Sequence, residues 1–465
     1  MKINLGKSEI IHFVGIGGIG MSGLALIMKS LGFKIQGSDI NYTKNIKRIK
    51  KKNVKIFYGH NSTNIKKATI LVISSAIKPN NVELKEAKKK NLPIYKRGDM
   101  LAHITSLKKN IVIAGSHGKT TTTSLVAAIF SNANLDPTII NGGVINSIDN
   151  SAKLGKSEWC ILESDESDGS FVKLPPTYAV ITNIDHEHMD YYKSFNNFKK
   201  YFFKFMLNVP SFGKTFLCID DKNNYNIYKS KKIKNILTYG LNEKSNFCIK
   251  NITYHLNYSK FDLYINLPNK KKINLYDFII PIIGDHNIKN AAAAIAVSYF
   301  IGIPLNSIKK SLKNFKGVER RFNKIFNYKG VDFYDDYAHH PTEIENVLDG
   351  VNKSFKNKKV TCIFQPHRVS RVNSLKNKFA KAFKNANKVV LCPIYKAGEN
   401  IKVKFNYYDF AKSISKNSKV SVFLVENKVS LIKYLKNNIN PKEIVIGMGA
   451  GSISNWIREL PKFLK

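Results

Sequence analysis

The 465-residue chain contains no apolar run of the roughly 18–20 residues that a membrane-spanning helix requires. Its N-terminus leads directly into a strand-like segment, without the apolar stretch and small-residue cleavage site of a signal peptide. Five cysteines are scattered through the sequence and form no CxxC pair, which argues against both a disulfide framework and a cysteine zinc site. We therefore expect a cytoplasmic protein with reduced thiols and no membrane insertion.

Acidic residues are also scarce: 33 Asp and Glu stand against 75 Lys and Arg, a net charge of +42. Such a charge is typical of nucleic-acid binders. However, only seven of the 75 are arginine, and the lysines are spread along a chain that is also rich in Asn, Ile, Tyr and Phe, as in proteins from AT-rich genomes. We interpret the charge as a compositional bias that attracts anionic small molecules, and we predict no specific nucleic-acid partner.

The few arginines are not evenly placed, because four of the seven form two clusters, Arg320-Arg321 and Arg368 with Arg371. The planar guanidinium binds carboxylates and phosphates through two parallel hydrogen bonds, which lysine cannot do. Both clusters are therefore candidate sites.

The length predicts two to four domains, and 43% hydrophobic residues exclude a disordered chain. Strand-like and helix-like segments alternate in three units, which predicts an α/β fold with parallel strands. We place the units at 1–108, 109–324 and 325–465, with a Rossmann-like first domain, a central mononucleotide-binding domain and a Rossmann-like third domain. The stretch 210–280 indicates short strands and loops, and Asn290–Phe300 indicates an apolar helix.

A glycine-rich loop follows the predicted strand Ile10–Val14 and matches the dinucleotide fingerprint, with Gly15, Gly17, Gly18 and Gly20. Such glycines let backbone amides approach a pyrophosphate at a helix N-terminus. Asp39, nineteen residues after Gly20, stands where an acidic residue would meet a ribose hydroxyl. The pattern fits NAD, FAD or a nucleotide sugar equally.

A shortened phosphate loop follows the predicted strand Asn110–Ala114, although the first glycine of the full motif is replaced by Ile113. Lys119 would reach the β/γ oxygens of a nucleotide, and Thr120 can bind Mg²⁺. The loop consists of Gly115, Ser116, His117, Gly118, Lys119, Thr120 and Thr121.

Two polar motifs end the next predicted strands. Four acids lie within Glu163–Asp168, and in a chain with so few acids this density favours a metal site beside the phosphate loop. The second motif, Thr182–Asp190, contains His186 and His188. By itself it does not distinguish a metal site from structural histidines.

Three further polar motifs lie in the second half of the chain. Asp285, His286 and Asn287 open the Ala-rich helix and suit either capping or base recognition. Residues 335–343 and 365–371 each end a predicted strand of the third unit. They should therefore meet at the carboxyl edge of one sheet, where open α/β sheets bind ligands.

Taken together, these motifs resemble those of the Mur ligases, and most closely those of the branch that adds L-alanine. They occur in family order over most of the chain, and only the last 95 residues lack them apart from GMGAGS (447–452). The motifs are GIGGIGMSGLA (15–25), GSHGKTTT (115–122), ESDESD (163–168), TNIDHEHMDYY (182–192), GDHNIKNAAAA (284–294), ERRF (319–322), DDYAHHPTE (335–343) and QPHR (365–368).

The resemblance implies an enzyme of peptidoglycan biosynthesis that uses ATP and Mg²⁺ to join L-alanine to the carboxylate of UDP-N-acetylmuramate through an acyl phosphate. The UDP-sugar would bind the first domain, at Gly15–Gly20 and Asp39, ATP the central domain and alanine the third. We expect a monomer or a weak homodimer.

The resemblance also assigns individual residues. Lys119 matches the γ-phosphate lysine. Glu163 and His188, with Thr120, match magnesium ligands, and His186 is the alternative to His188. The remaining matches are Asn287 and Asn290 at the ATP end, Arg321 and Asp336 brought to the nucleotide by the third domain, and His340, Arg368 and Arg371 near the alanine.

Four alternatives stay open at this point. A murein-tripeptide recycling ligase shares most motifs, whereas folate-type glutamate ligases lack the N-terminal unit. An NAD-dependent oxidoreductase would leave the phosphate loop unexplained. A nucleic-acid binder would need basic motifs interleaved with aromatics, and none stands out.

Overall fold

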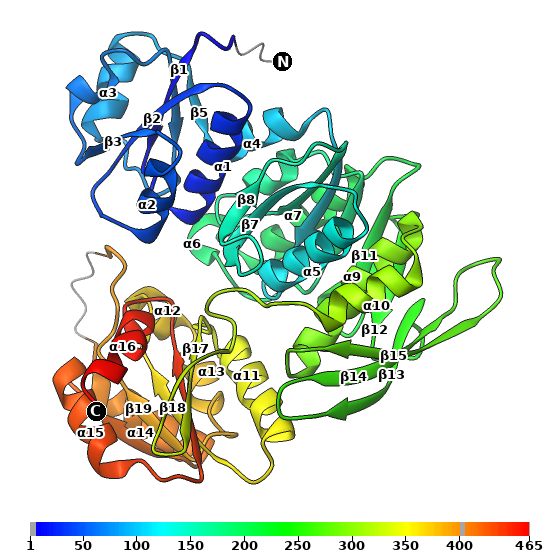
Figure 1. Ribbon diagram of the computed structural model, residues 1–465, viewed down its shortest axis with the longest axis vertical. Coiled ribbons are helices and arrows are strands. Elements are labelled where there is room, and N and C mark those ends of the chain that lie inside the picture. The colour runs from blue at the N-terminus through cyan, green and yellow to red at the C-terminus, as the bar shows by residue number, and fades with distance from the viewer. Residues whose placement is uncertain (1–5, 400–404, 465) are drawn as a thin grey trace. The chain divides into compact units, whose positions relative to one another are not determined.

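The computed structural model describes residues 6–399 and 405–464 and contains three sheets (Figure 1). The first sheet is entirely parallel, in the order β3-β2-β1-β4-β5, and confirms the predicted Rossmann-like unit. Its elements are β1 (Ile10–Val14), α1 (Ile19–Ser30), β2 (Lys34–Asp39), α2 (Lys44–Lys50), β3 (Lys55–Tyr58), η1 (Ser62–Ile65), β4 (Ile70–Ile73), α3 (Val82–Lys89), β5 (Ile94–Lys96) and α4 (Arg97–Thr105).

The second sheet has ten strands, in the order β15-β14-β13-β12-β11-β10-β6-β9-β7-β8. The predicted short strands within 210–280 are confirmed, although the helix α8 was not foreseen. The elements are β6 (Lys109–Ala114), α5 (Lys119–Asn132), β7 (Thr138–Ile145), β8 (Asn150–Lys153), β9 (Trp159–Glu163), η2 (Ser170–Lys173), β10 (Tyr178–Ile181), α6 (Met189–Tyr192), α7 (Phe195–Leu207), β11 (Lys214–Cys218), α8 (Lys222–Lys229), β12 (Ile236–Gly240), β13 (Phe247–Tyr254), β14 (Ser259–Ile265), β15 (Ile273–Ile280), α9 (Asp285–Ile301) and α10 (Leu305–Lys313).

The third sheet has the order β16-β17-β21-β18-β19-β20, and only its edge strand β16 runs antiparallel to its neighbour. Apolar clusters cover both of its faces, as a buried parallel sheet requires. The elements are β16 (Asn323–Tyr328), β17 (Val331–Asp336), α11 (Pro341–Ser354), β18 (Lys359–Phe364), α12 (Val369–Ser374), α13 (Lys376–Lys381), β19 (Lys388–Leu391), α14 (Tyr407–Ser418), β20 (Ser421–Leu424), α15 (Lys428–Asn438), β21 (Glu443–Met448), α16 (Ile453–Glu459) and η3 (Leu460–Lys462).

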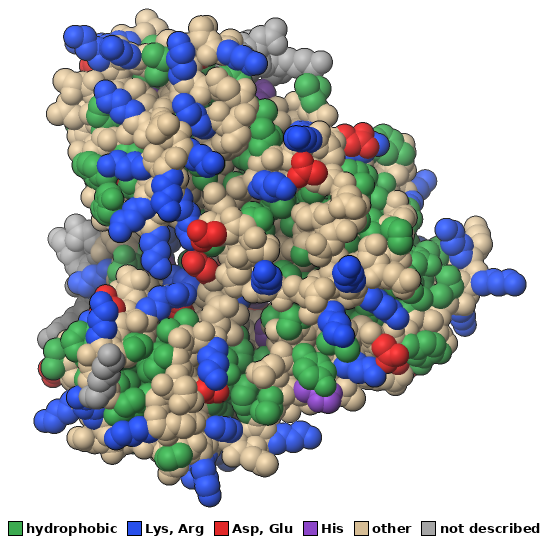
Figure 2. Space-filling model, viewed as in Figure 1, with side chains coloured by type: hydrophobic (Ala, Val, Ile, Leu, Met, Phe, Trp, Pro, Cys, Tyr) green, Lys and Arg blue, Asp and Glu red, His purple; other side chains and the backbone are tan. Residues whose placement is uncertain are grey.

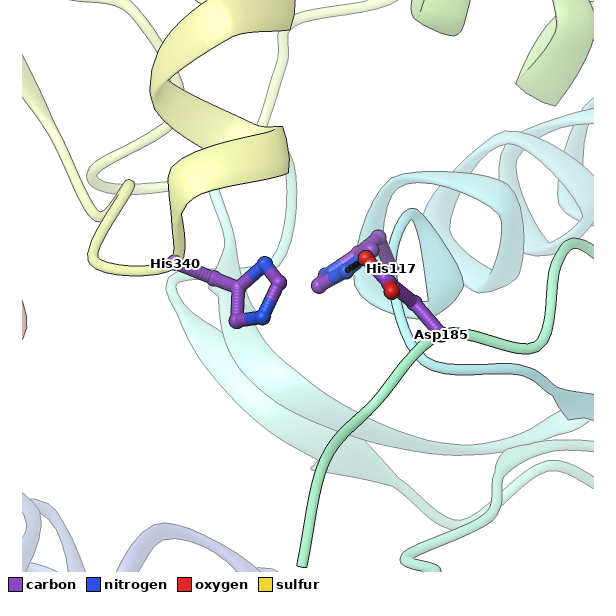
Figure 3. A group of neighbouring side chains, drawn as sticks. All are labelled: His117, Asp185 and His340. Carbon is purple, nitrogen blue, oxygen red and sulfur yellow. Dashed lines mark hydrogen bonds and ion pairs between the residues drawn. The ribbon is translucent and has the colours of Figure 1, made fainter. Parts of the chain in front are cut away.

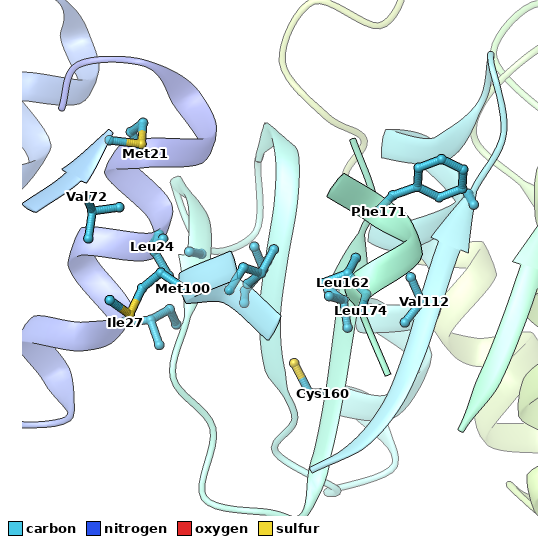
Figure 4. Packing of buried hydrophobic residues seen from close by; sticks show 14 of the residues in the cluster. Met21, Leu24, Ile27, Val72, Met100, Val112, Cys160, Leu162, Phe171 and Leu174 are labelled. Carbon is cyan, nitrogen blue, oxygen red and sulfur yellow. The ribbon is translucent and has the colours of Figure 1, made fainter. Parts of the chain in front are cut away.

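The chain forms two compact units. The first contains the first sheet and most of the second, and a single apolar cluster joins the two sheets. Figure 4 follows this cluster from Leu24 on α1 and Met100 on α4 to Leu162 on β9 and Phe171 on η2. The second unit consists of residues 252–260, 279–288 and 317–465.

Lysine and arginine side chains are scattered over the face drawn in Figure 2 and interspersed with other residue types. On this face the positive charge is thus dispersed, which agrees with lysines that are spread along the chain. No helix among the described residues is long and apolar enough to cross a membrane.

A buried polar cluster centred on Glu83 lies beside the carboxyl end of β2. Oε2 of Glu83 accepts from Ser38 Oγ at 2.6 Å, and Oε1 accepts from Asn64 Nδ2 at 2.6 Å. His60 Nδ1 and His12 Nε2 lie 3.1 and 3.5 Å from Oε2. Burial alone would raise the pKa of Glu83, but the contacts with His12, Ser38 and Asn64 outweigh it and lower the pKa to about 2. The ionised carboxylate therefore stabilises the first sheet.

Replacing Glu83 by glutamine should destabilise the protein by roughly 3 kcal/mol at pH 7, because the lowered pKa is a stability contribution. For a carboxyl group with a lowered pKa, this contribution is fully present above the pKa of the group in the unfolded chain, about 4.3, and is lost as the pH falls toward 2. The free energy of unfolding, measured with urea, should thus differ between wild type and Glu83→Gln by about half as much at pH 3 as at pH 5.

The control for this experiment is Glu86→Gln on the same helix. Glu86 forms a partly exposed ion pair with Lys90 at 3.5 Å, and its loss should cost less than about 1 kcal/mol. A Glu83→Gln deficit that stays constant with pH would contradict the role assigned to the ionised carboxylate.

Candidate functional site

Three motifs lie at one edge of the second sheet, because the strands before them are parallel neighbours in the order β10-β6-β9. The phosphate loop follows β6, the acidic motif follows β9 and the motif with the two histidines follows β10. The predicted grouping of the first two motifs is confirmed, and the third joins them at the same edge.

Two glycines give the phosphate loop its shape. Gly115 has φ +135°, and a Cβ there would lie 2.0 Å from Oγ1 of Thr182. Gly118, at φ +83°, precedes α5, and a Cβ there would lie 2.5 Å from Oδ1 of Asn290. Only glycine fits both the conformation and the space. The loop therefore brings backbone N–H groups to the N-terminus of α5, as phosphate binding requires.

The segment after β10 braces this loop. The backbone N–H of His117 donates to Oδ1 of Asn183 at 2.9 Å, and Oγ1 of Thr182 donates to the carbonyl of His117 at 2.6 Å. The backbone carbonyl of Asp185 accepts a hydrogen bond from Oγ of Ser116 at 3.2 Å. Figure 3 shows the carboxylate of Asp185 against the His117 ring, with Oδ2 and Nε2 3.2 Å apart. The chain's own hydrogen bonds thus hold the loop in position.

Lys119 is the centre of charge in this region. Its Nζ donates to Oε1 of Glu166 at 2.8 Å and to the carbonyls of Gly115 and Ser116 at 2.6 and 3.0 Å. Burial alone would lower the pKa of Lys119, but the attraction of Glu166 and other nearby carboxylates raises it. Lys119 is therefore a permanent cation at the phosphate loop, and an incoming phosphate would compete with Glu166 for it.

Two groups of side chains near Lys119 carry oxygen and nitrogen atoms that could bind a metal ion. Oγ1 of Thr120 donates to Oε1 of Glu163 at 3.1 Å. Ligand atoms of Glu166, Glu187 and His188 all lie within 4.8 Å of one another. Carboxylate and hydroxyl oxygens are the ligands that Mg²⁺ prefers, so the donor set fits the predicted ion.

His188 is itself partly buried, and Glu166 and Glu187 lie 3.7 and 3.9 Å from its Nε2. Burial alone would lower the pKa of His188, but these two carboxylates raise it. The other histidine of the motif, His186, stacks on Phe195 with ring centroids 3.7 Å apart.

The glycine loop of the first sheet is held by Asp39. Oδ2 of Asp39 accepts from the backbone N–H of Gly17 at 2.8 Å, and Oδ1 accepts from Asn41 at 2.9 Å. A Cβ at Gly17 would lie 2.9 Å from the same carboxylate. Asp39 thus fixes the conformation of the loop that it was predicted to assist, and its ribose contact stays a prediction.

In the second unit, the first arginine cluster packs around Tyr337. The guanidinium carbons of Arg320 and Arg321 lie 4.6 and 5.5 Å from the centre of its ring. Asp336 accepts backbone N–H groups of Phe322 and Ala338 at 2.8 and 2.7 Å. Burial raises the pKa of Asp336 to about 6, although Arg321 opposes the rise.

The second arginine cluster surrounds His367. Nη1 of Arg371 lies 3.2 Å from Nδ1 of His367, whose ring stacks on Tyr395 with centroids 5.6 Å apart. The His339 ring meets His367 edge-on at 5.7 Å. Burial and the nearby charges of Arg371 and Arg368 lower the pKa of His367 to about 4. Residues from the two predicted carboxyl-edge motifs therefore meet, as expected from the sheet order.

The remaining predicted residues have local contacts. Nδ1 of His340 caps α11 by accepting from the Thr342 N–H at 3.3 Å. The N–H of Arg368 donates to the Tyr395 carbonyl at 2.9 Å, and Asn287 Nδ2 donates to the Ile283 carbonyl at 2.8 Å. The roles predicted for His340, Arg368 and Asn287 stay predictions.

Sequence reasoning missed two neighbours of Lys119, namely Glu166 and Glu187. Glu166 was visible within the acidic motif, three residues after Glu163, but nothing in the spacing indicates which acid faces the lysine. Glu187 stands between the two histidines that drew attention as metal ligands, and its proximity to Lys119 follows only from the fold.

Comparison with protein families identifies the class. The Mur ligase family catalytic domain matches residues 10–109, the Mur ligase middle domain matches 113–298, and the Mur ligase glutamate ligase domain matches 320–451. The chain belongs to the Mur ligase family.

Individual relatives narrow the comparison further. The chain is 63% identical to UDP-N-acetylmuramate–L-alanine ligase of Pelagibacter ubique over 100% of both chains. It is 42% identical to the enzyme of the same name from Rickettsia bellii, over 98% of this chain and 96% of that one. The crystal structure of UDP-N-acetylmuramate-alanine ligase from Thermotoga maritima covers 97% of this chain and 98% of its own, with a TM-score of 0.82 and 28% identity. A murein peptide ligase from Psychrobacter arcticus, at 22% identity and a TM-score of 0.72 over 98% of both chains, shares the fold.

Proposed function

We propose that this chain is an ATP-dependent ligase that joins L-alanine to the carboxylate of UDP-N-acetylmuramate, in the cytoplasm, as a step of peptidoglycan biosynthesis. The observation that carries the proposal is the 63% identity, over the whole chain, to a ligase of that name. A braced phosphate loop with a partly buried lysine supports it at the level of chemistry. An NAD-dependent oxidoreductase has no use for such a loop, and family membership removes that alternative.

The substrates would be distributed over the three sheets. UDP-N-acetylmuramate would bind at Gly15–Gly20 of the first sheet, and ATP at residues 115–121 with Asn290 beside them. Alanine would bind in the second unit near His340, Arg368 and Arg371. Arg321 and Asp336 would serve the nucleotide, and Asn287 stands near the start of α9.

The chemistry requires two displacements. A carboxylate is a poor acyl donor, so its oxygen first attacks the γ-phosphorus of ATP and ADP leaves. The amine of alanine then attacks the acyl carbon, and inorganic phosphate leaves with the former carboxylate oxygen. Lys119 would exchange Glu166 for the γ-phosphate and offset the negative charge that both substrates bring.

Magnesium is the cofactor that the ligand set around Lys119 fits. Thr120, Glu163 and His188 would hold it, with Glu166 and Glu187 close by. When bound, it would supply positive charge to the phosphate oxygens. The residues themselves position the loop and the partly buried lysine.

The decisive test is phosphate release from ATP in the presence of UDP-N-acetylmuramate and a panel containing L-alanine, L-serine, glycine and L-alanyl-γ-D-glutamyl-meso-diaminopimelate. We expect release to require the sugar nucleotide and to be fastest with L-alanine. Preference for the tripeptide would instead identify a recycling ligase, the alternative that the shared fold leaves open. Calorimetry should show binding of the sugar nucleotide and not of NAD.

A further inference from the structure

The first two sheets meet at the start of α4, where consecutive residues contact the segment that follows β9. Nη2 of Arg97 donates to Oδ2 of Asp165 at 2.7 Å. The next residue, Gly98, packs so closely on Ser170 that a Cβ would lie 2.3 Å from its Oγ. The joint between the sheets is therefore built on the acidic motif beside the phosphate loop.

The other side of the Arg97 guanidinium faces the glycine loop. A Cβ at Gly20, in the first turn of α1, would lie 3.2 Å from Nη1 and 3.3 Å from Cδ of Arg97. The Arg97 side chain is only 14% exposed. One side chain thus contacts both the helix that begins at the glycine loop and the acidic motif of the second sheet.

The contact continues to the phosphate loop. Oδ1 of Asp165 accepts from the Ser167 N–H at 3.0 Å, which fixes the turn that carries Glu166. Glu166 in turn binds Lys119 at 2.8 Å. Arg97, which packs on Gly20, is therefore linked to Lys119 through two ion pairs, because their acidic partners Asp165 and Glu166 are consecutive residues.

We propose that Arg97 is a positioning residue that sets the distance between the bound sugar nucleotide and the γ-phosphate of ATP. The inference rests on the proposed function, in which the muramoyl carboxylate on one sheet must reach a phosphorus atom on the other. A planar guanidinium can lie flat on Gly20 and bind Asp165 at once, which an ammonium cannot do. Reacting atoms displaced by about 1 Å can lose roughly 100-fold in rate.

Arg97→Lys keeps the charge and removes the planar fork, and Asp165→Asn removes the partner while Arg97 stays in place. We expect each change to lower kcat about tenfold or more. The dissociation constants of UDP-N-acetylmuramate and of ATP, each measured alone by calorimetry, should change less than about threefold. The double variant should lose no more than the more impaired single variant, because both remove the same contact.

The matched control is Asp99→Asn. Asp99 pairs with Lys173 at 2.6 Å in the same joint, but it touches neither loop, so kcat should be unchanged. Wild-type kcat in Arg97→Lys and Asp165→Asn, an equal loss in Asp99→Asn, or a loss that matches the fraction of unfolded protein would each overturn the inference. If the wild type itself releases no phosphate with UDP-N-acetylmuramate, the proposed function fails instead. If Arg97→Lys does not fold, Asp165→Asn alone decides.

Discussion

Lys119→Ala is expected to abolish turnover while leaving the affinity for UDP-N-acetylmuramate within about threefold of wild type. Lys119 lies at the phosphate loop of the second sheet, whereas the sugar nucleotide is assigned to the glycine loop of the first. Loss of one charged donor from a transition state costs about 100- to 1,000-fold, and this donor is the central cation of its site. Phosphate release measures turnover, and calorimetry measures sugar-nucleotide binding.

Removal of Lys119 has a second consequence, because it leaves the buried Glu166 carboxylate without its 2.8 Å partner. The variant Lys119→Ala/Glu166→Gln separates the two effects. We expect the added Glu166→Gln change to restore thermal stability and not turnover. Lys109→Ala, which removes an exposed lysine paired with Glu158 at the start of β6, is the control with unchanged kcat. Near-normal phosphate release by Lys119→Ala would show that the phosphate-loop assignment is wrong.

Arg321→Lys should lower kcat by about 100-fold or more although it keeps the charge. The chain uses lysine 68 times and arginine seven times, so an arginine kept at this position indicates a forked contact to phosphate or carboxylate. In the structure, Nη1 of Arg321 lies 4.0 Å from Oε1 of Glu343, a long contact for a structural ion pair. The guanidinium is partly exposed and rests on the Tyr337 ring, and we propose that a substrate replaces Glu343 as its partner.

Arg458→Lys is the matched control for this variant. Nη2 of Arg458 binds Oδ2 of Asp335 at 3.1 Å, and Asp335 is fully buried between β17 and α16. We expect Arg458→Lys to lower the melting temperature and leave kcat unchanged. Arg321→Lys should lower kcat and leave the melting temperature unchanged. Full kcat with a lowered melting temperature in Arg321→Lys would identify Arg321 as a structural residue.

The fold could be predicted where the sequence carries local signals. Each glycine-rich or acidic motif follows a short apolar strand, and the order of strands and helices identified three α/β units. The edge strand β16 and the helix α8 were not foreseen, because polar residues interrupt their few apolar ones and leave no clear period.

Contacts between distant segments could not be predicted in the same way. Arg97 is one of seven arginines, but its partner Asp165 stands 68 residues further along the chain, in the segment that follows a strand of the second sheet. Likewise, it is the turn after β9 that places Glu166, and not another acid of the motif, next to Lys119. The shared core of the first two sheets arises from side chains such as Met100 and Leu162, which look like ordinary core residues of separate domains.

The central claim is that the sugar carboxylate is activated by phosphorylation, and transfer of oxygen isotope tests it most directly. UDP-N-acetylmuramate labelled with ¹⁸O in both carboxylate oxygens is turned over with ATP and L-alanine, and the released phosphate is examined by mass spectrometry. The account predicts one ¹⁸O atom in each phosphate, because the carboxylate oxygen that attacks the γ-phosphorus leaves with it. Unlabelled phosphate, released while the amide product forms, would contradict the acyl-phosphate mechanism.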